Sequence, residues 1–291
     1  MGKRVSEDGK MEKKNEGVKP KYTKLKAIKN IAVVVVVYFA VMISVQTLRE
    51  VIGKVAFQGF FESSDANYLF VALANISLCF IVPLLVKKNT NKSIRRYFYV
   101  RKLRLTDILM VFLAAYAIPR LVMHVEGLLL AGRVKVTENT SDTRTLIFFC
   151  SAVLIGPIAE EIILRYAMIE QMRKSFSKIT ILFVTALFFA LLHDYTIQGF
   201  TCMFLSFIFV SVYYLRTGNL LFTILWHVLY NLITYVMDGR VFDTFWSSIY
   251  YVKDGFIIYR PVGLTGLIIM ALTGILYYYL CVYQKSNKKL M

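Results

Sequence analysis

The sequence predicts an all-α, polytopic membrane protein with about eight transmembrane helices and both termini in the cytoplasm. Of its 291 residues, 57% are apolar and only 18% are charged, whereas an average soluble domain is about half apolar and a quarter charged. The apolar residues gather in long runs, and the run from Ile31 to Val45 carries no charge. The basic residues gather in short segments between these runs, where membrane proteins place them.

Each long apolar run is a candidate membrane-spanning helix. A hydrocarbon core of about 30 Å needs roughly 20 residues of helix, and most of the runs approach that length. The fifth run is short, and its turn into the sixth is tight. We predict spans at residues 31–48, 66–86, 106–123, 146–170, 179–195, 197–215, 219–237 and 262–283.

The distribution of lysine and arginine sets the orientation. With a cytoplasmic N-terminus, the predicted inner segments hold 25 of these residues and the outer segments hold 8. Cytoplasmic loops carry the excess of basic residues, so both termini are predicted to lie inside. The chain then divides into a basic disordered cytoplasmic tail (1–30), N-terminal transmembrane helices (31–144) with an interfacial segment (87–105), a core (145–237), and an outer loop with the last transmembrane helix (238–291).

The net charge of +17 does not indicate a nucleic-acid partner, because the basic residues flank hydrophobic runs instead of forming one continuous patch. We expect the lipid bilayer to be their neighbour. The four cysteines all lie inside apolar runs, where they are expected to act as small apolar packing residues.

Ionisable residues inside predicted spans point to function, because a charge at the bilayer centre costs about 2.5–3.5 kcal/mol on insertion scales. The fourth span contains Glu160, Glu161 and Arg165. Glu161 and Arg165 are four residues apart on one helix face and can form an ion pair. Glu160 is rotated by about 100° from Glu161, so it keeps no local cation and is free to take a proton.

Two histidines and an asparagine lie in other predicted spans, namely His193, His227 and Asn231. Counting 1.5 Å per residue from the cytoplasmic ends puts these side chains and Glu160 at depths of about 12 to 21 Å. In such a layer, a carboxylate and an imidazole can deprotonate a water, while a second imidazole and an amide stabilise an oxyanion. Alternatively, Glu160, His193 and His227 could hold a zinc ion with one open position.

These residues form three motifs that resemble those of the CAAX protease and bacteriocin-processing family, also called the Abi family, of intramembrane glutamic endopeptidases. The resemblance covers roughly residues 145 to 237. The segment Leu215–Asn219 and Trp226, which precede the motif that begins at His227, also look typical of the family. The motifs are Glu-Glu-x-x-x-Arg at Glu160, Glu161 and Arg165, Phe-x-x-x-His at Phe189 and His193, and His-x-x-x-Asn at His227 and Asn231.

The resemblance implies a role for each motif residue. Glu160 and His193 would activate the hydrolytic water, and His227 and Asn231 would form the oxyanion hole. Glu161 and Arg165 would be orienting or structural. By the same resemblance the reaction needs no metal or other cofactor, with a zinc-dependent metalloendopeptidase as the alternative.

The predicted function is therefore that of an intramembrane endopeptidase acting on membrane-associated peptides or proteins. A composition rich in Lys, Ile and Tyr favours a bacterial plasma membrane and bacteriocin or pheromone processing, or self-immunity. The alternatives are a CAAX prenyl-protein endopeptidase, placed in the endoplasmic reticulum if the source is eukaryotic, an ion-coupled transporter, and a non-catalytic membrane partner.

Overall fold

The computed structural model describes residues 23–55, 58–61, 63–90, 145–193, 197–237, 250–253 and 256–259, with isolated positions at 105, 108, 109, 112, 115, 271 and 274. Several predictions fall outside the described residues. These are the spans at 106–123 and 262–283, nearly all of the interfacial segment, and residues 1–22 of the predicted tail.

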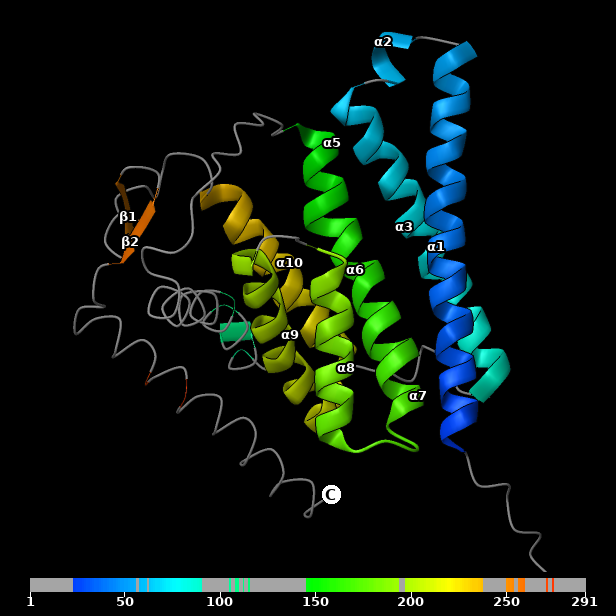
Figure 1. Cartoon of the computed structure of the whole chain (residues 1–291), viewed down its shortest axis with the longest axis vertical. Coiled ribbons are helices and arrows are strands. Elements are labelled where there is room, and N and C mark those ends of the chain that lie inside the picture. Colours follow the sequence, from blue (N-terminus) through cyan, green and yellow to red (C-terminus); the bar gives the residue numbers. More distant parts are fainter. Residues whose placement is uncertain are drawn as a thin grey trace, which may run out of the picture.

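The described elements are helical except for one short hairpin (Figure 1). The elements are α1 (Lys24–Val55), α2 (Gln58–Phe61), α3 (Ser64–Thr90), α5 (Leu146–Phe148), η2 (Phe149–Ile155), α6 (Gly156–Glu161), η3 (Ile162–Ile169), α7 (Glu170–Met172), α8 (Lys178–Leu191), α9 (Ile197–Thr217), α10 (Leu220–Met237), β1 (Tyr250–Lys253) and β2 (Phe256–Tyr259).

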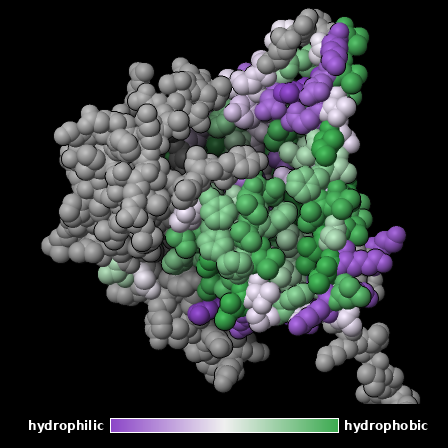
Figure 2. All heavy atoms as spheres, viewed as in Figure 1, coloured by the Kyte–Doolittle hydropathy of each residue, from purple (hydrophilic) through white to green (hydrophobic). Residues whose placement is uncertain are grey.

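Among the residues that the structure describes, three helical stretches are long and apolar enough to cross a membrane, namely Lys24–Val55, Ser64–Lys88 and Leu146–Met172. They confirm long apolar helices at the predicted spans 31–48, 66–86 and 146–170. The predicted fifth, sixth and seventh spans are also helices, but their apolar parts are shorter. Figure 2 shows apolar surface along the molecule with polar residues gathered at its two ends. The protein is an integral membrane protein by this character.

The first helix begins earlier than predicted, and this corrects the assignment of residues 1–30 as a disordered tail. Helix α1 starts at Lys24, where the Thr23 hydroxyl accepts a hydrogen bond from the Lys26 backbone N–H at 3.2 Å, a regular N-cap arrangement. Ala27 and Asn30 are buried on its first turns. Packing against the rest of the protein therefore orders a segment whose composition alone predicts a solvated chain.

The fourth span is not one regular α-helix. Two π-helical segments, η2 and η3, flank the short α6 that carries both motif glutamates. Segments of π-helix are rare and occur frequently at functional sites. Every residue of η3 is buried, and it forms the centre of the main hydrophobic core.

The hairpin is a departure from the all-α prediction. Strands β1 and β2 pair antiparallel, with Tyr250 opposite Tyr259. They lie in the segment 238–261 that was predicted to be an outer loop.

The helices form layers around the fourth span. Helices α1 and α3 pack together, and α3 also packs on η2, α6 and η3. Helices α8 and α9 pack together beyond the fourth span, while α10 contacts α6 and η2 (Figure 1). The short α6 therefore has α3 on one side and α10 on another, which places its glutamates between the layers.

Candidate active site

The second motif glutamate lies in a closed ion-pair network. Arg165 Nε lies 2.8 Å from Glu161 Oε2, and both side chains are 1% exposed. Arg165 Nη2 donates to Glu161 Oε1 at 3.3 Å, and Nη1 donates to Ser211 Oγ at 3.0 Å. The guanidinium also lies 3.7 Å from the centre of the Phe207 ring. The predicted pairing of Glu161 with Arg165 is present.

The histidine of the third motif, His227, connects this network to the other glutamate. His227 is buried on α10, and its Nδ1 lies 3.2 Å from Glu161 Oε1. An ionised carboxylate only accepts hydrogen bonds, so Nδ1 carries the proton and donates it. This bond fixes the orientation of the ring and leaves His227 Nε2 directed at Glu160 Oε2, 3.6 Å away.

Glu160 is the meeting point of the two histidines. Its Oε2 atom lies 3.4 Å from His193 Nε2 as well as near His227. That oxygen is buried and, within the described part of the chain, has no hydrogen bond of regular geometry. The side chain as a whole is 27% exposed. The structure thus brings together Glu160, His193 and His227, which three separate spans were predicted to supply.

His193 is held by the other residue of its motif. Helix α8 ends at Leu191, so His193 lies in the turn after the helix and not inside a span that continues to residue 195. Its Nδ1 lies 2.9 Å from the Phe189 carbonyl oxygen, which again makes Nδ1 the donor. The two rings lie with their centroids 4.0 Å apart. Phe189 therefore packs in the core and also fixes the imidazole.

Asn231 contacts the backbone of the fourth span. Its Nδ2 donates to the carbonyl oxygen of Ala152 at 2.9 Å. The residue five positions after Ala152 is Pro157, which has no backbone N–H to donate, and the Gly156 N–H bonds to the Ser151 oxygen instead. Asn231 thus satisfies a carbonyl that the π-helical turn leaves unpaired.

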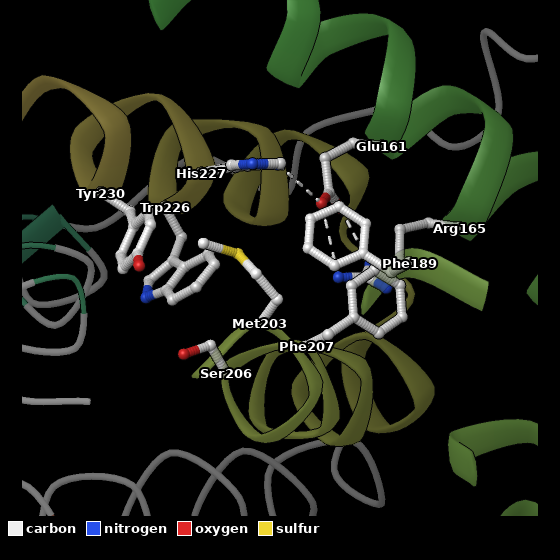
Figure 3. Close-up of a pocket in the computed structure, with 9 residues that line it drawn as sticks. All are labelled: Glu161, Arg165, Phe189, Met203, Ser206, Phe207, Trp226, His227 and Tyr230. Carbon is white, nitrogen blue, oxygen red and sulfur yellow. Dashed lines mark hydrogen bonds and ion pairs between the residues drawn. The ribbon is translucent and has the colours of Figure 1, made fainter. Parts of the chain in front are cut away.

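A small cavity lies on the Glu161 side of the site (Figure 3). It offers about 10 Å³ to the centre of a water-sized sphere, which is close to what one water molecule needs. It cannot take a peptide side chain. Its lining residues are Glu161, Arg165, Phe189, Met203, Ser206, Phe207, Trp226, His227 and Tyr230.

A comparison with protein families now identifies the motif-bearing part of the chain. Residues 142–233 match the family model described as Rce1-like, type II CAAX prenyl endopeptidase. This part resembles a protease domain. The match spans about a third of the chain, and it confirms the resemblance that the three motifs indicated. No curated protein and no solved structure gives a significant match.

The Rce1-like region, residues 142–233, includes the junction between α9 and α10. Gly218 has a φ of +66°, and its N–H donates to the Tyr214 oxygen at 2.7 Å, as expected for a glycine that ends a helix. Asn219 then caps α10 by accepting from the Phe222 N–H at 3.1 Å. The Leu215–Asn219 segment that looked typical of the family is therefore a helix-stop and helix-start signal that directs α10 toward the site.

The same geometry bears on the zinc alternative. Among the residues that the structure describes, no group of three or more His, Cys, Asp or Glu side chains has an arrangement that could hold a metal ion. A chelator experiment tests whether Glu160, His193 and His227 bind zinc.

Two side chains outside the Rce1-like region also approach the site, and the sequence reasoning missed both. Tyr38 on α1 interacts electrostatically with Glu160. Asn75 on α3 is buried, and its Nδ2 lies close to Gly156, next to Glu160. Counting from Lys87, Asn75 lies at a depth of about 18 Å, the same layer as the motif residues. Extending the depth count to every polar residue of the other spans would have found it.

Proposed function

We propose that the protein is an intramembrane endopeptidase in which Glu160 and His193 activate a water molecule for hydrolysis of a peptide bond. The observation that supports this most strongly is the convergence of three proton-accepting atoms: Glu160 Oε2 lies 3.4 Å from His193 Nε2 and 3.6 Å from His227 Nε2. Because both Nδ1 atoms donate elsewhere, each neutral ring offers a lone pair at Nε2. Such a centre binds and transfers protons.

The proposed reaction starts with a water molecule at Glu160. The carboxylate and His193 remove one of its protons while the water oxygen forms a bond to the peptide carbonyl carbon. The tetrahedral intermediate then collapses, the carbon–nitrogen bond breaks, and the removed proton passes to the leaving amine. The products are a carboxylic acid and an amine, so the water supplies every atom added and no other reactant is needed.

His227 is suited to stabilise the oxyanion in one protonation state. Nε2 can donate a hydrogen bond only when both ring nitrogens carry protons, since Nδ1 donates to Glu161. In that state the two glutamates are balanced by Arg165 and the imidazolium, which leaves the buried cluster without net charge. The second N–H of the Asn231 amide would supply the other donor, because only one is needed for the Ala152 carbonyl.

The substrate we propose is a membrane-associated peptide or protein segment. The description of the matching family favours a prenylated C-terminal CAAX sequence, whereas the composition of the chain favours bacteriocin or pheromone processing. In either case the substrate carries an apolar part beside the scissile bond, and the exposed apolar surface of the helices is compatible with such a molecule.

The test compares the purified protein with Glu160→Gln, His193→Ala and Glu170→Gln in detergent. The probes are a quenched fluorescent peptide ending in a farnesylated CAAX sequence and an unprenylated leader-type peptide of the same length. We expect Glu160→Gln and His193→Ala each to lower kcat by about 10²–10⁴-fold with unchanged melting. Glu170→Gln is the matched control, because Glu170 pairs with Arg173 away from the site and should keep full activity.

Each alternative has its own result in this experiment. Loss of cleavage with a chelator, restored by zinc, would replace the metal-free mechanism by a zinc site. Equal cleavage by Glu160→Gln and the wild-type protein would refute the proposal. A cellular phenotype that survives both Glu160→Gln and His193→Ala would favour a non-catalytic partner, and substrate binding without cleavage would favour a transporter.

A further inference from the structure

An amide side chain from outside the Rce1-like region faces the proposed active site. Asn75 lies near the middle of α3 and is 7% exposed. Helix α3 packs against both η2 and α6, so Asn75 approaches the fourth span from α3, whereas His227 and Asn231 approach it from α10. The side chain makes no hydrogen bond within the part of the chain that the structure describes.

Gly156 defines the position of this amide relative to Glu160. A Cβ atom built on Gly156 would lie 3.8 Å from Asn75 Nδ2 and 3.8 Å from Glu160 Oε1. The two polar atoms therefore border the same small space and are at most twice that distance apart. A Cβ at position 156 would be in van der Waals contact with both atoms.

The two oxygens of the Glu160 carboxylate have different surroundings. Oε2 lies beside the Nε2 atoms of both histidines, and Oε1 lies toward Asn75. Nδ2 of an asparagine is a donor and a carboxylate oxygen is an acceptor, so the pair across the gap is complementary. The Ser151 carbonyl also borders the gap, but it already accepts the N–H of Gly156.

We propose that Asn75 is a positioning residue for Glu160, and this inference rests on the function proposed above. Its Nδ2 donates to Oε1 through one water molecule in the gap beside Gly156. That bond holds the carboxylate plane with Oε2 aimed at the histidines. A buried amide in the apolar middle of α3 is unfavourable without a partner, and Glu160 supplies one. The catalytic geometry thus depends on a helix outside the matched family region.

The test uses two substitutions at position 75 and one control on the same helix. Asn75→Leu keeps the approximate size but removes the donor, and Asn75→Gln keeps an amide. Asn67→Leu is the matched control, because Asn67 lies on the same helix and accepts hydrogen bonds from Gln46 and Arg49 at 3.1 and 3.0 Å, away from the site residues. Melting, kcat and KM on the farnesylated peptide are measured for all three, with Glu160→Gln in parallel.

We expect Asn75→Leu to lower kcat by about 10- to 100-fold, as for the loss of one hydrogen bond to a charged group, with KM and melting close to wild type. Asn75→Gln should recover part of kcat. Asn67→Leu should lower the melting temperature without changing kcat of the folded protein. A normal kcat in Asn75→Leu, or a loss that only follows lower melting, overturns the inference.

The outcome also separates this inference from the proposed function. Cleavage by wild type and by Asn75→Leu, with none by Glu160→Gln, refutes the role of Asn75 and leaves the protease intact. If wild type cleaves neither peptide, infrared difference spectra of wild type minus Glu160→Gln report the Glu160 carboxylate band directly. The inference then requires that Asn75→Leu shifts this band and Asn67→Leu does not, and an unshifted band overturns it.

Discussion

Two neighbouring glutamates of one short helix have opposite surroundings. Glu161 is 1% exposed and its oxygens are engaged by Arg165 and His227. Glu160 is 27% exposed, its Oε2 lies beside two imidazoles, and among the residues that the structure describes no guanidinium is paired with it. The Glu161 side is a closed ion-pair network, whereas the Glu160 side is a partly open polar gap.

The comparison shows how adjacent identical residues acquire different roles. A buried carboxylate with a permanent cation is held ionised and stabilises the fold only as part of its network. A carboxylate that faces groups able to gain and lose protons can take part in proton transfer. His227 links the two sides, because its Nδ1 contacts Glu161 and its Nε2 faces Glu160.

The largest effect on stability is expected from breaking the closed side. Arg165→Met leaves the Glu161 charge buried without its main partner, and removing one member of a buried ion pair lowers the unfolding free energy by about 3–5 kcal/mol. The double variant Arg165→Met, Glu161→Gln removes both charges and should recover most of the loss. Melting in detergent measures both. The same measurement on Glu160→Gln should give a melting temperature close to that of the wild-type protein.

Similar melting of Arg165→Met and the wild-type protein would contradict the distinction between the two sides. So would a strong loss of stability in Glu160→Gln, because it would show that Glu160 also belongs to the structural network.

A smaller and divided effect is expected at Asn231, which serves both the fold and the proposed oxyanion site. Asn231→Leu should lower kcat by about 10²–10³-fold, as for other oxyanion donors, and should lower stability by about 1 kcal/mol through the lost bond to Ala152. Adding Pro157→Ala restores a backbone N–H five residues after Ala152. Melting and peptide cleavage of the single and double variants separate the two roles.

In the double variant we expect melting to recover while cleavage stays low. Recovery of cleavage together with melting would mean that Asn231 acts only by holding the π-helical turn, and the oxyanion role would then fall to His227 alone.

The sequence was a good guide to the motif residues because charged and polar groups in apolar spans have few structural explanations. Glu160, His193 and His227 meet as their estimated depths suggested, and the Glu161–Arg165 pair follows from their spacing. Those inferences needed only the helical period and the unfavourable burial of charge.

Other features depend on tertiary packing and could not be read in the same way. The apolar pattern of the fourth span predicts a regular α-helix and gives no sign of the π-helical turns or of the Asn231–Ala152 bond, although Pro157 is a local signal for a missing donor. Asn75 belongs to no motif. The early start of α1 depends on the burial of Ala27, and the turn at His193 depends on contacts with Phe189.

The smallest expected effect concerns Gly218, at the α9–α10 junction that leads α10 to both sides of the site. A residue with a Cβ is strained at a φ of +66°, so Gly218→Ala should lower the unfolding free energy by about 1 kcal/mol. Gly59→Ala is the matched control, because a Cβ there meets nothing within 4 Å and its φ is not positive. Melting and kcat are measured for both variants.

Because the strain lies far from the carboxylates, folded Gly218→Ala should cleave as the wild-type protein does. A loss of kcat without a loss of stability would instead show that this turn sets the position of His227, and would extend the catalytic geometry from the two glutamates to the junction itself.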